Sequence, residues 1–148
     1  MGEVAAEATI DASLKEVWEA FFNENSWAAW VDGFDRIVSC SEGYPGPSGK
    51  LRWRSIPTGR GEVSEQVLDH EPRRHHRISF ADPESEGELS TTFEIRGEGV
   101  VVSRRMAYTV LHPGLLGPLT DVFFVRRQVA AALTRELAGL KYELEANL

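Results

Sequence analysis

Residues 10–22, IDASLKEVWEAFF, contain the start of an amphipathic helix. Ser13 and Glu16 have the spacing of a capping box, in which the serine hydroxyl and the glutamate carboxylate each satisfy a free backbone N–H. Apolar side chains then recur at helical spacing. The pattern predicts a helix over residues 13–23 with an apolar stripe formed by Leu14, Val17, Trp18, Phe21 and Phe22.

The segments on either side of this helix have different periods. Residues 4–10 alternate between apolar and polar side chains, which predicts a half-buried strand. Trp27 and Trp30 lie three positions apart and predict a second short helical turn around residues 26–31. The chain therefore begins with a strand followed by two short helices.

From about residue 34 to residue 111, segments with strand character alternate with clusters of Gly, Pro, Asp and Glu that favour turns. Connections this short join antiparallel neighbours, because parallel strands require long crossovers. The predicted strands are residues 36–41, 50–55, 61–69, 75–81, 87–97 and 99–111.

Residues 118–147 have a long helical pattern with one apolar stripe. At about 1.5 Å per residue, such a helix is much longer than a strand and must cross several of them. A strongly curved sheet cannot pack flush against a straight helix, so a gap remains between the two. We therefore expect one α+β domain over residues 1–148, with a curved antiparallel sheet, a long C-terminal helix and an apolar cavity.

The bulk composition limits the possible functions. A formal net charge of −7 argues against nucleic acid as a main partner, because phosphate binding needs a basic face. No apolar run reaches the roughly 20 residues of a membrane-spanning helix. Cys40 is the single cysteine, which excludes an internal disulfide and fits a cytoplasmic protein. We expect Cys40 to be a small packing residue on a strand.

The motif of residues 10–18, the tryptophans Trp27 and Trp30, and the terminal pattern Leu137-x-x-Leu140-Lys141-x-x-Leu144-Glu145 resemble the START-related SRPBCC superfamily. That superfamily includes polyketide cyclases and aromatases, pollen-allergen-type carriers and lipid-transfer domains. The resemblance covers nearly the whole chain. It implies a helix-grip fold, in which a seven-stranded sheet wraps around the long C-terminal helix and encloses a hydrophobic cavity.

Three functions agree with this resemblance. The first is the binding of a lipid, polyketide or isoprenoid, with little or no catalysis. The second is a polyketide cyclase or aromatase, and the third is an interaction domain of the co-chaperone or stress-regulator type. The sequence contains no strong catalytic motif, which favours the first function. It leaves the ligand and the oligomeric state undetermined.

Three residues are candidates for catalysis. Arg104 shares one face of its predicted strand with Met106 and Tyr108, where a cation binds a ligand carboxylate or stabilises an enolate unless a bulge turns it outward. Glu65 lies between two valines and is a general base or an arginine partner, or else lies on a solvated face. Tyr108 offers a hydroxyl to an oxygenated ring.

The remaining expected ligand contacts are large or amphipathic side chains on the predicted inner faces. Arg126 interrupts the stripe of the last helix and either faces the cavity or extends along the surface into water. Residues 112–118 form an apolar loop that is either a lid or a static cap. The predicted ligand-binding residues are Trp27, Trp30, Trp53, Phe80, Thr91, Phe93, Met106, Leu115, Leu116, Phe123 and Arg126.

We expect neither a metal nor a cofactor. The histidines His75 and His76 point to opposite faces of a regular strand and cannot chelate one ion together. No HExxH, CxxC or glycine-rich phosphate loop occurs in the sequence. The basic cluster of residues 73–77 is interpreted as a solvated hairpin end.

Overall fold

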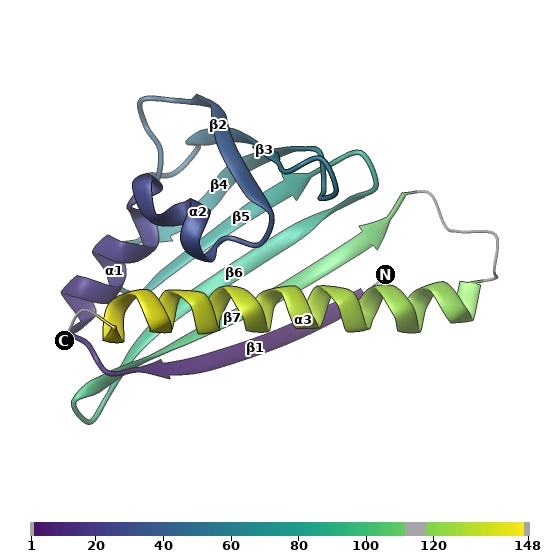
Figure 1. The fold of residues 1–148 in the computed structure, drawn as a ribbon. Helices are drawn as coiled ribbons and strands as arrows, with labels where there is room; N and C mark the ends of the chain where they lie inside the picture. Colours follow the sequence, from purple (N-terminus) through teal and green to yellow (C-terminus); the bar gives the residue numbers. More distant parts are fainter. Residues whose placement is uncertain (1, 112–117, 147–148) are drawn as a thin grey trace.

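The computed structural model describes residues 2–111 and 118–146, with the side chains of residues 118–122 left aside. Its seven strands form one antiparallel sheet in the order β1-β7-β6-β5-β4-β3-β2, and the long helix α3 runs along one face of this sheet (Figure 1). This arrangement confirms the predicted α+β helix-grip fold. The elements are β1 (Gly2–Ile10), α1 (Leu14–Phe22), a 3-10 turn (Glu24–Ser26), α2 (Trp27–Trp30), β2 (Phe34–Cys40), β3 (Lys50–Ser55), β4 (Glu62–Glu71), β5 (His75–Ala81), β6 (Ser85–Arg96), β7 (Gly99–Val110) and α3 (Pro118–Glu145).

Hairpins connect β2 through β7, and the first strand returns to pair with the last. Ile10 pairs with Val100 and Gly2 with Tyr108 along the β1–β7 ladder. The strands β3 and β5 have the predicted bounds, whereas β6 begins at Ser85 because that residue pairs with Val110. β2 contains two register shifts, and β4 contains one, which lies between Val67 and Asp69.

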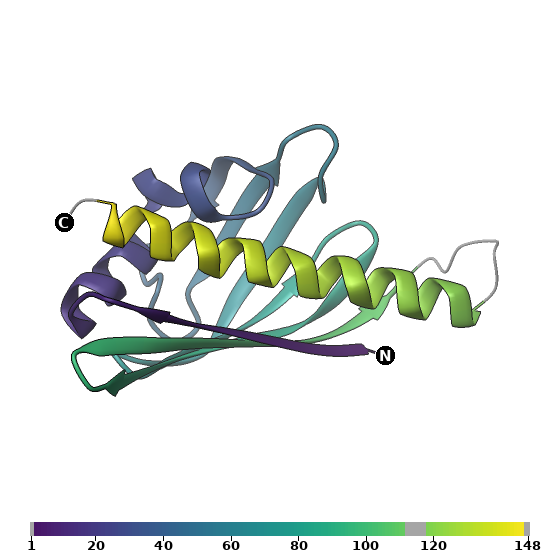
Figure 2. The ribbon, with the colours of Figure 1, turned by 60° about the horizontal axis from the view of Figure 1, so that its bottom comes forward.

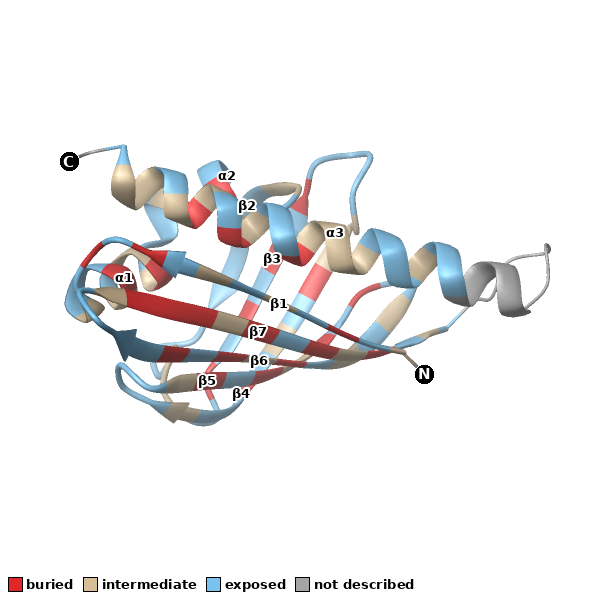
Figure 3. Cartoon of the chain, turned by 90° about the horizontal axis from the view of Figure 1, so that it is seen from below, coloured by how far each residue is buried: buried red, intermediate tan, exposed pale blue. Residues whose placement is uncertain are grey.

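The core lies between the inner face of the sheet and α3. Leu133, Leu137 and Leu140 of the helix are almost fully buried, as are Ile10 and Val102 of the strands beneath them. Buried residues follow β7 below α3, whereas the first turns of the helix project past the end of β1 (Figures 2 and 3). The fully buried part of the helix stripe therefore lies in its second half, whereas Val125, Val129 and Ala130 of the first half are only partly buried against the core.

The start of α1 has the predicted capping box. The Glu16 backbone N–H donates to Ser13 Oγ over 3.1 Å, and the Ser13 N–H donates to Glu16 Oε1 over 3.4 Å. The cap fixes the direction in which the chain leaves β1. The helix then buries Val17 and Phe21 against the sheet.

Cys40 is exposed at the end of the edge strand β2, so the prediction that it packs in the interior is wrong. In the part of the chain that the structure describes, no other element packs over a side chain at the end of this edge strand. The alternation of apolar and polar residues in the sequence does not show which strand lies at the edge of the sheet. Among the described residues, no helix is both long and apolar enough to cross a membrane.

The pairing of β4 with β5 brings two histidines together on the inner face. His70 is opposite His76, and their Nδ1 atoms are 2.9 Å apart, so that one ring donates and the other accepts. Burial, the neighbouring His70 and the charge of Arg104 lower the pKa of His76 to about 3. His76 is therefore neutral near pH 7, whereas His75 points to the opposite face and contacts Asp69.

The short helix α2 packs against α3 at a glycine. A Cβ atom at Gly139 would lie 3.0 Å from Trp30 Cβ and 3.1 Å from Trp30 Cα. The close approach holds the Trp30 side chain in its buried position, where it is 5 % exposed. Gly139 lowers the intrinsic helix propensity of α3, but it allows α2 and α3 to pack closely together.

We predict that Gly139→Leu lowers the free energy of unfolding by about 1–3 kcal/mol, because the added side chain forces α2 away from α3. Urea denaturation measures this change. The matched control is Ala138→Leu, an exposed position of the same helix, which should stay within about 0.5 kcal/mol of the wild type. Equal effects of the two substitutions would contradict the packing role of Gly139.

We also predict that His76 makes the fold acid-sensitive. A histidine whose pKa is lowered by folding stabilises the protein above the unfolded pKa of about 6.5, and this contribution is lost as the pH falls towards the folded value. The free energy of unfolding should fall by about 1 kcal/mol per pH unit below pH 6. Urea denaturation at a series of pH values should show a shallower slope for His76→Asn than for the wild type.

Candidate functional site

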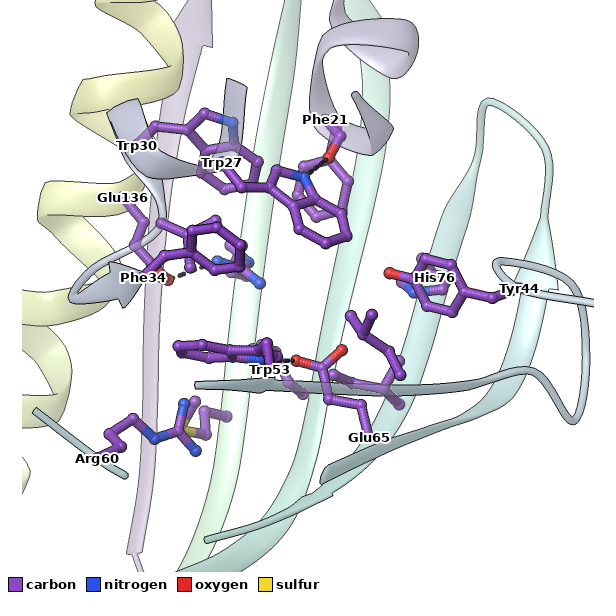
Figure 4. Close-up of a pocket in the computed structure, with 16 residues that line it drawn as sticks. Phe21, Trp27, Trp30, Phe34, Tyr44, Trp53, Arg60, Glu65, His76 and Glu136 are labelled. Carbon is purple, nitrogen blue, oxygen red and sulfur yellow. Dashed lines mark hydrogen bonds and ion pairs between the residues drawn. The ribbon is translucent and has the colours of Figure 1, made fainter. Parts of the chain in front are cut away.

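A cavity of about 80 Å³ lies between the inner face of the sheet, the helices α1 and α2, and one turn of α3. Most of its wall is aromatic or aliphatic, and a few polar groups interrupt that wall (Figure 4). The apolar lining consists of Phe21, Trp27, Trp30, Val31, Phe34, Leu51, Trp53, Ile78, Leu89 and Met106, and the polar lining of Tyr44, Arg60, Glu65, His76, Arg104 and Glu136.

The tryptophans of the wall are fixed by hydrogen bonds to the protein. Trp27 Nε1 donates to the carbonyl of Phe21 over 2.9 Å, and Trp30 Nε1 donates to Ser26 Oγ over 3.3 Å. The Phe34 ring contacts Trp53 with a centroid distance of 5.6 Å. Because the indole N–H groups already have acceptors, the ring faces remain available for an apolar ligand.

Arg104 enters the cavity from β7 and forms an ion pair with Glu136 of α3. Arg104 Nη1 donates to Glu136 Oε1 over 2.6 Å, and Arg104 Nε donates to Thr91 Oγ1 over 3.2 Å. The two charged side chains are only 9 % and 13 % exposed. The other oxygen of Glu136 accepts the backbone N–H of Asp32 over 3.0 Å. The guanidinium charge is thus neutralised inside the protein.

Glu65 reaches the cavity from β4. Its Oε2 accepts a hydrogen bond of 2.9 Å from Trp53 Nε1. Burial raises the pKa of the Glu65 carboxyl, and the Trp53 hydrogen bond together with the charges of Arg60 and Arg104 only partly offsets this effect. A carboxyl group with a raised pKa in an apolar site exchanges protons closer to neutral pH than a solvated one does.

Tyr44 and His76 lie side by side on the opposite wall. Their rings meet edge to face with a centroid distance of 6.2 Å, and Tyr44 also contacts Trp27. Burial raises the pKa of the Tyr44 phenol, with a further contribution from the charge of Glu65. Tyr44 therefore keeps its proton at neutral pH, and its hydroxyl points into the cavity (Figure 4).

Arg60 covers the edge of the cavity from the turn between β3 and β4. Its Nε donates to Asp82 Oδ2 over 2.8 Å, and its guanidinium lies 5.0 Å from the centre of the Phe80 ring. Asp82 also accepts the backbone N–H groups of Glu84 and Ser85. This second cation therefore has a carboxylate partner as well.

Six of the residues predicted from the sequence lie together in this wall, namely Trp27, Trp30, Trp53, Glu65, Met106 and Arg104. Three others lie behind it. Thr91 supports Arg104, Phe80 lies beneath Arg60, and Phe93 contacts Phe21 and Trp18.

Tyr108, Phe123 and Arg126 lie away from the cavity. Tyr108 packs over Gly2 of β1, since a Cβ atom at Gly2 would overlap its phenol ring. Phe123 is 65 % exposed and Arg126 is exposed too, because the first turns of α3 project beyond the sheet. The predicted contacts Leu115 and Leu116 lie outside the described residues.

Several polar residues of the cavity lining were not predicted from the sequence. Glu136 is on the same helical face as Leu133 and Leu140, and a charged residue at that position was a usable signal. Tyr44 and Arg60 belong to connections rich in Gly and Pro, where no periodicity indicates an inward direction. His76 was assigned to a basic hairpin end, although alternation with Ile78 and Phe80 places it on the buried face.

Comparison with known proteins identifies the family. The family model described as polyketide cyclase / dehydrase and lipid transport matches residues 1–145. No curated protein matches the chain.

Solved structures with the same fold come from several bacteria. A START superfamily protein from Mycobacterium smegmatis has a TM-score of 0.74 at 14 % identity, with 99 % of each chain covered. A Thermus thermophilus protein has a TM-score of 0.71 at 21 % identity, again with 99 % of each chain covered. The Aha1 dimer from Colwellia psychrerythraea has a TM-score of 0.65 at 15 % identity, with 98 % of this chain and 97 % of that chain covered. The match over residues 1–145 and the START-like fold show that the chain belongs to the polyketide cyclase / dehydrase and lipid transport family of the SRPBCC superfamily.

Proposed function

We propose that this protein binds a hydrophobic small molecule, such as a lipid, a polyketide or an isoprenoid, in the cavity between the sheet and α2. The observation that carries the proposal is an aromatic wall whose indole N–H groups are satisfied by the protein itself. Such a wall offers apolar ring faces at little desolvation cost. The family description, which joins polyketide chemistry with lipid transport, supports the same class of ligand.

The size of the cavity sets a condition on this function. A volume of about 80 Å³ is well below the roughly 300 Å³ at which pockets for drug-sized ligands begin. A larger ligand therefore requires part of the wall to move. One wall is formed by the short helix α2 and by the connection from Val31 to Phe34, and the opposite wall is formed by the hydrogen-bonded sheet. The first wall is the one more easily displaced.

An enzymatic role of the cyclase type is the second candidate, and Glu65 is the observation that favours it. A carboxyl group with a raised pKa beside a ligand is suited to proton transfer. The other two predicted catalytic residues give less support, since Arg104 is neutralised by Glu136 and Tyr108 packs against β1. We therefore place binding ahead of catalysis.

The four tryptophans provide a direct test of binding. Trp27, Trp30 and Trp53 line the cavity, whereas Trp18 packs outside it against Phe22 and Phe93. We predict that the uncharged probe N-phenyl-1-naphthylamine, titrated into ¹⁵N-labelled protein, shifts the indole N–H signals of the first three in two-dimensional NMR spectra. The Trp18 signal serves as the internal control and should move least.

Saturable shifts of the three cavity tryptophans support the proposal. Shifts dominated by Trp18, or by residues of the outer sheet face, would place the probe elsewhere and contradict it. Native mass spectrometry followed by organic extraction of the purified protein then identifies the chemical class of any natural ligand that copurifies.

A further inference from the structure

The polar groups that face the cavity differ in how far the protein already satisfies them. Arg104 is paired with Glu136 over 2.6 Å, and Arg60 is paired with Asp82 over 2.8 Å. Glu136 also accepts the backbone N–H of Asp32. Both cations in the wall thus have carboxylate partners, so neither brings an unbalanced positive charge to a ligand.

Glu65 and Tyr44 face the cavity without an ionic partner. Trp53 occupies only Oε2 of Glu65, which leaves Oε1 directed into the cavity. The Tyr44 hydroxyl points into the same space (Figure 4), and none of the hydrogen bonds among residues 2–111 and 118–146 involves it. The cavity therefore offers one carboxyl oxygen as acceptor and one phenol hydroxyl as donor.

Charged ligands are disfavoured at this position. A ligand carboxylate would face the carboxyl groups of Glu65 and Glu136, while the charges of Arg60 and Arg104 are already balanced by carboxylates, and the burial of an unbalanced charge is costly. A ligand ammonium group would be attracted by Glu65 but repelled by the guanidinium groups of Arg60 and Arg104, which line the same small cavity. A neutral hydroxyl avoids both penalties, because it donates to Glu65 and accepts from Tyr44.

We infer that the cavity selects uncharged ring compounds that carry a hydroxyl group, and that Glu65 and Tyr44 are the residues that determine this specificity. The inference rests on the proposed binding function and adds to it the polarity of the ligand. It also reverses the expectation that Arg104 attracts an acidic ligand, because Glu136 already neutralises that arginine.

The test uses single-ring probes that differ in one substituent, namely toluene, phenol, benzoate and benzylammonium. The dissociation constant of each is measured at pH 7 from the shifts of the Trp27, Trp30 and Trp53 indole signals. We expect phenol to bind at least about tenfold more tightly than benzoate or benzylammonium. The burial of one unpaired charge costs more free energy than a tenfold difference in the dissociation constant represents.

Glu65→Gln provides the sharpest variant. The Trp53 N–H needs an oxygen acceptor, so the glutamine oxygen stays bound to it and the NH₂ group turns to the cavity. An acceptor is thereby replaced by a donor. We expect phenol to bind about 3–10-fold more weakly and benzoate more tightly, so that the preference for phenol falls or is reversed.

Tyr44→Phe removes only the hydroxyl. It should weaken the binding of phenol by about 2–10-fold and leave the binding of toluene unchanged. The matched control is Glu94→Gln on the outer face of β6, where the side chain is 72 % exposed, and it should bind all four probes like the wild type. The unchanged toluene affinity of each variant shows that its cavity is still folded.

The possible results separate this inference from the proposed function. Toluene binding with benzoate or benzylammonium as tight as phenol overturns the inference and leaves the binding function intact. An unchanged ratio of phenol to benzoate in Glu65→Gln also overturns it. A failure of every probe, toluene included, to shift the cavity indoles overturns the proposed function and the inference together.

Discussion

The structure depends on the packing of one straight helix against a curved sheet. Leu133, Leu137 and Leu140 bury the second half of α3 against β1 and the inner face, and this contact forms the main core. A helix of 28 residues, about 42 Å long, cannot follow the curvature of seven strands. It therefore separates from the sheet above β3 to β5, and α2 with its two tryptophans fills the space that results (Figure 1). The cavity is what remains of that space.

Polar groups in this remaining space follow a consistent rule. A buried charge needs a partner, and each guanidinium in the wall has a carboxylate within hydrogen-bonding distance. Glu65 is the departure, because a tryptophan N–H is its only hydrogen-bond partner among the described residues and burial raises its pKa. Structures tend to break such rules at functional sites, where a ligand completes the arrangement. The carboxyl of Glu65, rather than the guanidinium of Arg104, is therefore the group that a ligand would complete.

Alternation along the strands predicted part of the site and failed where other constraints act. Arg104 and Trp53 face inward as expected because β7 and β3 are regular, and Glu65 lies before the register shift of β4. Glu136 was not predicted as the partner of Arg104, since the two are joined only when α3 crosses the sheet. Phe123 was expected to be buried, yet a stripe on a helix cannot indicate where the sheet beneath it ends. Tyr44 lies in a connection, where sequence gives no direction to a side chain.

The two carboxylate oxygens of Glu136 bind different partners, and this difference affects how a small cavity can accept a larger ligand. Oε1 holds Arg104, whereas Oε2 holds the backbone of Asp32, whose side chain also binds Arg135 at the surface. If the segment around Asp32 moves outward, the bonds it loses are partly exposed and are replaced by water at small cost. The buried pair of Arg104 and Glu136 remains intact during such a movement, so no unpaired charge is created. The wall that carries α2 can therefore move without breaking a buried ion pair, and the cost that remains is the exposure of Trp27 and Trp30.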